Sequence, residues 1–293
     1  MSALRTCVLV GGGLLLLAAC GGTEAPSEGP PRYVTTISPF EMILAPIVEG
    51  RGTVDALLAP GSSPHTYDPT PSNVRTVANG RALVYGAEQL DGWAADLSTS
   101  RRLALLDLVP PTAQRSFENT ETVDPHFWTD PQAVISLLPV LADTLCAIDA
   151  EGCSTYQANA DSFATALATL DARLRTILQP IRDTPVLLAQ PFFRYFLHQY
   201  GPLLVGVVEP RPGAEPTPRQ LQAMVQVAET SGARGILTQQ HLSARAAQAV
   251  AESATLPLVP LDPLGGTEGR ETYAELMLYN ARVLRDSLSR FAP

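Results

Sequence analysis

Residues 154–181 read STYQANADSFATALATLDARLRTILQPI, and this stretch sets the layout of the whole chain. It holds no glycine, and no proline before Pro180. Its larger apolar residues recur three or four positions apart, which places them on one face of a helix. Such a helix spans on the order of 40 Å, enough to run along two compact lobes. We therefore predict a connecting helix at 154–182 between lobes at 32–153 and 183–293.

Short apolar runs alternate with helical patterns on both sides of this helix. That alternation predicts an α/β fold with two lobes, each a mainly parallel sheet flanked by helices, joined by one long rigid helix. The expected strands are 33–37, 54–58, 82–85, 103–106, 185–189, 203–208, 235–238 and 258–261. The expected helices are 40–48, 72–78 with Ser72 as its N-cap, 90–97, 133–147, 192–200, 219–231 after Thr217, 244–253 and 272–291.

The first twenty residues are predicted to be a lipoprotein signal peptide. Arg5 supplies the positive start, residues 8–19 are apolar, and Leu-Ala-Ala-Cys ends the stretch at Cys20. That ending resembles the lipobox of bacterial lipoproteins; an ordinary cleaved signal peptide is the alternative. Residues 21–31 have no apolar period and are expected to form a flexible tether. We therefore expect lipid on Cys20 and a mature protein in the periplasm or on the outer face of a membrane.

Charge and cysteine content narrow the function classes. The formal net charge of −9 argues against nucleic acid as a partner, since no basic stripe is present to neutralise phosphates.

Two of the four cysteines remain for a disulfide, because Cys7 leaves with the predicted signal peptide and Cys20 takes the lipid. These two are Cys146 and Cys153. In an oxidising compartment these two are expected to form a disulfide, with two free thiols as the alternative.

Two of the four histidines lie in loops bracketed by prolines. His65 stands in Pro-His-Thr-Tyr-Asp-Pro at 64–69, and His126 in Asp-Pro-His-Phe-Trp-Thr-Asp-Pro at 124–131. Each proline fixes its own φ and restricts the residue before it, so these loops are stiff. Gln190 and Asp262 follow predicted strands, where parallel sheets bind ligands. Two imidazoles and a carboxylate suit zinc or a neighbouring divalent metal.

The order of motifs resembles the substrate-binding lipoproteins of zinc and manganese ABC importers. The resemblance covers the chain from Tyr33 onward and implies a monomer with a metal buried between two lobes, delivered to an ABC permease in the cytoplasmic membrane. It implies His65, His126 and Asp262 as ligands, with the third ligand position at Gln190. The matching stretches are 61–68, 82–86, 90–93, 124–131, 156–160, Gln190 with 195–196, 261–266, and 273–277 with Asn280.

Gln190 is the main departure from that family, whose members have His or Glu at this place. A glutamine offers only a neutral amide oxygen, a poorer ligand for zinc. Gln239 stands where many relatives have a glutamate. Three hypotheses stay open: zinc is held by His65, His126 and Asp262 with Gln190 or water; His241, or less favourably His198, supplies a nitrogen; or the site has changed its ligand.

The surroundings of His126 also carry predictions. Asp124 or Asp130 is expected to hydrogen-bond its distal ring nitrogen, the usual arrangement around a metal-bound histidine. Phe127, Trp128 and Trp93 are expected in the core. 

No hydrolase or phosphate-binding motif is present, so we predict no enzyme. The function predicted is that of an extracytoplasmic receptor for zinc, with manganese second. A surface adhesin on the same scaffold is the alternative.

Overall fold

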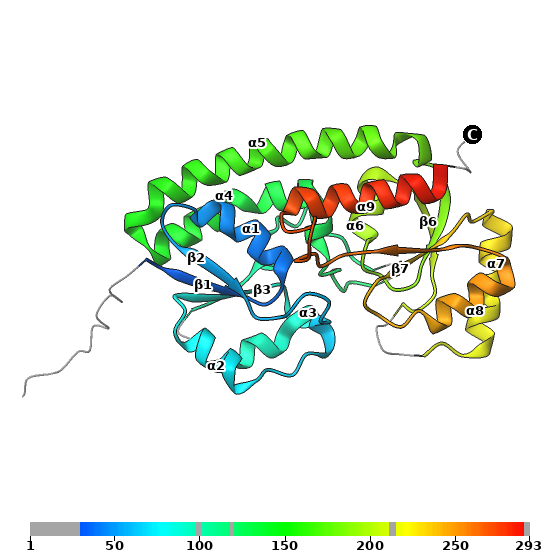
Figure 1. Ribbon diagram of the computed structural model, residues 1–293, viewed down its shortest axis with the longest axis horizontal. Coiled ribbons are helices and arrows are strands. Elements are labelled where there is room, and N and C mark those ends of the chain that lie inside the picture. Colours follow the sequence, from blue (N-terminus) through cyan, green and yellow to red (C-terminus); the bar gives the residue numbers. More distant parts are fainter. Residues whose placement is uncertain (1–29, 98–100, 118–119, 211–214, 290–293) are drawn as a thin grey trace, which may run out of the picture.

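The computed structural model describes residues 30–97, 101–117, 120–210 and 215–289. The chain forms one parallel four-stranded sheet before the long helix α5 (Cys153–Leu178) and a second one after it. In space, α5 runs along both lobes (Figure 1). The predicted fold class is therefore confirmed. The predicted signal peptide, Cys20 and nearly all of the tether lie outside the described residues.

The two sheets share one topology. The first has the order β2-β1-β3-β4 and the second β6-β5-β7-β8, so each places its first strand next to its second and third. All their strand pairs are parallel. The strands are β1 (Arg32–Thr35), β2 (Thr53–Ala56), β3 (Ala82–Tyr85), β4 (Arg102–Ala104), β5 (Pro185–Leu188), β6 (Leu203–Val207), β7 (Ile236–Gln239) and β8 (Leu258–Leu261).

Helices cover both faces of each sheet because successive strand residues point to opposite faces. In the first sheet Tyr33 and Val84 join the main core, whereas Val34 and Leu83 pack with Val77 of α2 on the other face. In the second sheet the outer face is covered by α7 and α8 (Figure 1). The helices are α1 (Ser38–Val48), α2 (Pro71–Ala78), α3 (Glu88–Asp91), α4 (Pro131–Ile148), α6 (Arg194–Tyr200), α7 (Pro218–Ser231), α8 (Arg245–Ala254) and α9 (Tyr273–Leu288).

Local chemistry shifted some helix boundaries. The predicted N-cap Ser72 is wrong: Thr70 caps α2, because Pro71 takes the first helical position and the Thr70 hydroxyl accepts from the Asn73 N–H at 3.3 Å. Thr217 caps α7 as predicted. The helix predicted at 90–97 is wrong as a single element, since α3 ends at Asp91, before Gly92, and a 3₁₀ turn (Gly92–Asp96) follows.

The main apolar core is continuous across the two lobes. One cluster of buried side chains includes Phe40 and Leu137 from the first lobe, Leu174 from α5, and Phe192 and Leu276 from the second lobe. α5 packs on α1, α4 and α9, which lie beneath it in Figure 1. By length and composition alone α4 is apolar enough to cross a membrane, but its apolar face belongs to this core.

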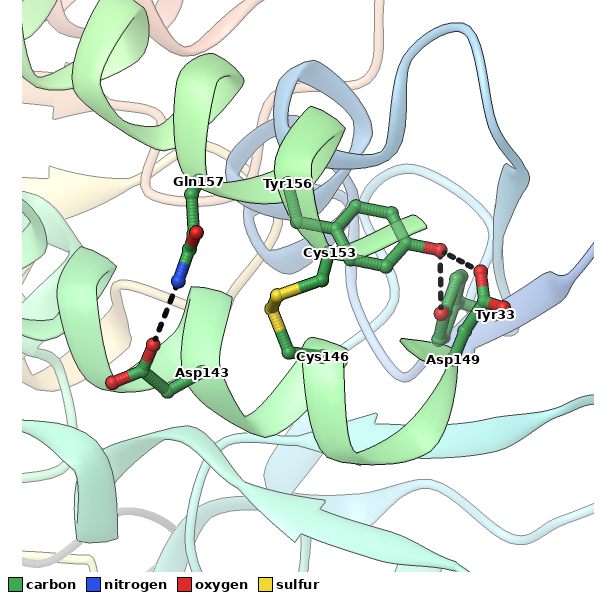
Figure 2. Close-up of a disulfide and its surroundings, with 7 residues drawn as sticks. All are labelled: Tyr33, Asp143, Cys146, Asp149, Cys153, Tyr156 and Gln157. Carbon is green, nitrogen blue, oxygen red and sulfur yellow. Dashed lines mark hydrogen bonds between the residues drawn. A yellow bond between two sulfur atoms is a disulfide. The ribbon is translucent and has the colours of Figure 1, made fainter. Parts of the chain in front are cut away.

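A disulfide closes the turn between α4 and α5. It joins Cys146, near the end of α4, to Cys153, the first residue of α5 (Figure 2). Beside it the Tyr156 hydroxyl donates to Asp149 at 2.6 Å. Arg51 forms a two-pronged ion pair with Asp149, at 2.7 and 2.8 Å, and its hydrogen bonds lower the pKa of that carboxyl to about 2. The turn between α4 and α5 is therefore held by the disulfide and, through Arg51, attached to the rest of the first lobe.

Candidate metal-binding site

His126 is held by a carboxylate from its own loop. The ring is buried, and Oδ1 of Asp124 accepts both the His126 backbone N–H, at 3.0 Å, and Nδ1–H, at 2.6 Å. Of the two predicted partners the structure selects Asp124; Asp130 instead accepts the Gln132 N–H at the start of α4. With Nδ1 donating to a carboxylate, Nε2 keeps its lone pair for a metal.

The loop that carries His126 is also bonded to the second lobe. The Tyr195 hydroxyl, on α6, donates to the Asp124 carbonyl at 3.1 Å. The indole N–H of Trp128 donates to the Pro263 carbonyl at 2.9 Å, and the Tyr273 hydroxyl donates to the Trp128 carbonyl at 2.6 Å. These bonds add to the burial of Trp128 in the core, which was predicted. His126 is therefore placed firmly at the boundary between the lobes.

His65 lies on a 3₁₀ turn (Pro64–Thr66) between β2 and α2. Its ring centroid is 5.6 Å from that of His126. Burial, together with the neighbouring His126, lowers the pKa of His65 to about 4, so the ring is neutral at neutral pH. Trp93, predicted in the core, is only partly buried and packs against it, and its indole N–H donates to the Pro64 carbonyl at 2.9 Å. It supports the turn from the side.

Gln190 is bonded to two polar neighbours of the second lobe. It follows β5 and is buried; its amide Nε2 donates to Glu209 at 3.2 Å. Its Oε1 accepts from Gln239 Nε2 at 3.5 Å, at the end of β7. The two glutamines singled out from the sequence therefore contact each other. Glu209 was missed, because it follows β6 in a Pro-rich loop without a recognisable motif.

Asp262 is fully buried and has both oxygens engaged. Oδ1 accepts the backbone N–H groups of Leu264 and Gly265, each at 2.9 Å. Oδ2 lies 2.9 Å from Nη1 of Arg270, an ion pair without the alignment of a hydrogen bond. Asn280 fixes the backbone by accepting the Asp262 N–H at 2.8 Å and donating to its carbonyl at 2.7 Å. Arg270 was not foreseen from the sequence.

The predicted site residues are therefore brought together only in part. His65, His126 and Gln190 line one cavity of about 1100 Å³ between the lobes. His65, His126 and His241 line a smaller cavity of about 20 Å³, whereas His198 lines a separate one. Asp262 lines none of these three. In the described ranges, no three His, Cys, Asp or Glu side chains are grouped closely enough to hold a metal ion as they stand.

Two parallel-sheet lobes on one connecting helix, with two imidazoles facing the interlobe cavity, define a substrate-binding protein of the two-lobed class. The chain belongs to the family described as zinc-uptake complex component A, periplasmic, whose model matches residues 34–287. Members of this family are metal-binding receptors of ABC importers. Membership places the chain among transport proteins, not enzymes.

Individual relatives differ in the metal for which they are named. A manganese-binding lipoprotein MntA of Halalkalibacterium halodurans is 25% identical over 289 residues, covering 94% of this chain and 95% of the relative. A high-affinity zinc uptake system protein ZnuA of Paracoccus denitrificans is 26% identical over 318 residues, covering 94% and 97%. The solved periplasmic zinc-binding protein TroA of Treponema pallidum shares the fold, with a TM-score of 0.77, 21% identity, and coverage of 89% and 99%.

Proposed function

We propose that this protein captures zinc between its two lobes and delivers it to an ABC permease, with manganese as the second-ranked metal. In this proposal it acts as a monomer, held on the outer side of a membrane by lipid on Cys20. The observation that carries it is the pair His65 and His126, with Asp124 holding the tautomer of His126. Both relatives above are named for these metals.

The chemistry of the pair favours zinc over manganese. Imidazole nitrogen suits zinc, whereas manganese prefers carboxylate and water oxygens. The low pKa of His65 means that no proton has to leave this ring when a metal binds at neutral pH. Gln190 offers an amide oxygen from the second lobe, and Asp262 becomes a ligand only if Arg270 leaves it.

Metal affinity of the lipid-free mature domain tests the proposal. Zinc and manganese are titrated against a chromogenic chelator with the parent chain, with His65→Ala and with His126→Ala. His198→Ala is the matched control, since His198 lines neither of the two cavities that His65 and His126 line. Zinc binding that both site variants lose and the control keeps would support the receptor function. A parent chain that binds neither metal would refute it.

A further inference from the structure

The smaller cavity between the lobes has the size of an ion site. Its volume of about 20 Å³ is enough for one water-sized sphere, which needs roughly 10–15 Å³. Three of the four histidines of the chain line it, namely His65, His126 and His241. The first two come from the first lobe, and His241 comes from the second.

His241 reaches across the lobe boundary to the loop that carries His65. It stands two residues after β7, in a turn where the Leu242 N–H donates to the Gln239 carbonyl at 3.4 Å. Its ring lies over Gly61: a β-carbon there would be 3.0 Å from Nδ1 of His241. Gly61 has a φ of +83°, so both the backbone conformation and the close ring favour glycine at this position.

Asp262 and Gln190, the second-lobe positions that the resemblance implies as ligands, already have partners. The Asp262 carboxylate is held by Arg270 and two backbone N–H groups. Gln190 is bonded to Glu209 and Gln239 and carries no charge. His241 is exposed, so turning its ring costs little desolvation. It is the strongest nitrogen donor that the second lobe brings to the small cavity.

We infer that His241 is the second lobe's metal ligand and completes a three-histidine zinc site with His65 and His126. Three imidazoles and one open position form a known tetrahedral zinc arrangement. The three donors are not yet close enough to bind one ion together, so binding requires His241 to turn inward or the lobes to close. A ligand on each lobe would favour the closed state. This inference rests on the proposed metal-receptor function and names its ligand set.

Zinc affinity and cobalt spectra of single variants test this assignment. His241→Ala should weaken zinc binding by at least the 10- to 100-fold that loss of an outer-shell partner costs. It should also change the visible d–d absorption of bound Co²⁺, which reports the ligand set. His198→Ala, removing a histidine outside the cavity, should change neither. Thermal unfolding of each apo variant checks that it is folded.

The outcomes separate the inference from the function on which it rests. If His65→Ala and His126→Ala lose zinc while His241→Ala keeps parental affinity and spectrum, the receptor function stands and this ligand assignment is overturned. If the parent chain itself binds no zinc, both fail.

Gly61 supplies a second, independent test. Gly61→Ala should displace the His241 ring and weaken zinc binding, and this loss should be smaller in a His241→Ala background, where only the backbone strain at Gly61 remains. Gly50→Ala is the matched control: Gly50 has a similar φ of +79°, but a β-carbon there meets nothing within 4 Å. A Gly61→Ala loss that is equal with and without His241 would contradict the assignment.

Discussion

The two halves of the site are prepared to different degrees. In the first lobe, His126 is buried and oriented by Asp124, and His65 is kept neutral by burial. In the second lobe, the carboxylate of Asp262 is paired with Arg270, and His241 is exposed. The histidines of the first lobe can accept a cation without rearrangement, whereas Asp262 of the second lobe must first lose its contact with Arg270. If the proposed site is correct, we expect a metal to bind the first lobe before the second.

Removing the Arg270 side chain, which pairs with Asp262 in the second lobe, should have the largest effect on stability. Arg270→Met leaves the buried Asp262 carboxylate without its partner, which costs about 3–5 kcal/mol of unfolding free energy in the apo protein. Urea unfolding with and without zinc measures it. If Asp262 then becomes a ligand, zinc restores part of the loss, and it does not do so in a double variant with Asp262→Asn.

Arg32→Met is the control for that experiment. Arg32 pairs with Asp55 at 2.6 Å, but the two side chains are 43% and 45% exposed, so the loss of this pair should cost less than about 1 kcal/mol. Equal losses in Arg270→Met and Arg32→Met would show that the Asp262 pair is no more important than a surface one.

Loss of the carboxylate that orients the first half comes next. Asp124→Asn keeps the shape of the side chain but removes the charge that fixes the Nδ1–H tautomer of His126. We expect a 10- to 100-fold weaker zinc affinity. Chelator competition measures it, with Asp130→Asn as the control because Asp130 contacts the start of α4 instead. Parental affinity in Asp124→Asn would mean that the first half needs no orienting charge.

The last prediction is a pH dependence of stability from His65, which acts only below neutral pH. Its ordinary pKa of 6.5 applies to the unfolded chain, and in the folded protein it is about 4. The unfolded chain therefore binds more protons between these values, so this contribution is fully present above pH 6.5 and is lost as the pH falls toward 4. Urea unfolding of apo His65→Gln should show a flatter slope than the parent in that window and a parallel curve above pH 7. Identical slopes would contradict burial of the neutral ring.

The fold was predictable because its signals are local. The alternation of strands and helices and the apolar period of α5 gave the two-lobed class. The predicted helix boundaries were wrong where a single residue decided the end of a helix. Pro71 takes the first position of α2, so Thr70 is its N-cap, and α3 stops before Gly92.

The site was predictable only as far as its loops are stiff. Proline brackets marked His65 and His126, and both lie at the interlobe cavity. The choice of Asp124 over Asp130 needed the actual turn of the loop. The pairing of Arg270 with Asp262 could not be predicted, because Arg270 comes eight residues later, in a loop with positive-φ glycines at 265, 266 and 269. The approach of His241 to Gly61 depends on packing between lobes, which no local pattern encodes.

The continuous core has a consequence for how the molecule comes apart. Since Phe40, Leu174 and Phe192 belong to one apolar cluster, neither lobe can melt without exposing the side chains on which the other is built. The two halves of this protein should thus share a single cooperative heat-absorption peak, with equal calorimetric and van't Hoff enthalpies. A lobe excised on its own would expose its part of that cluster to water, so we expect the smallest unit that folds to be the whole two-lobed domain.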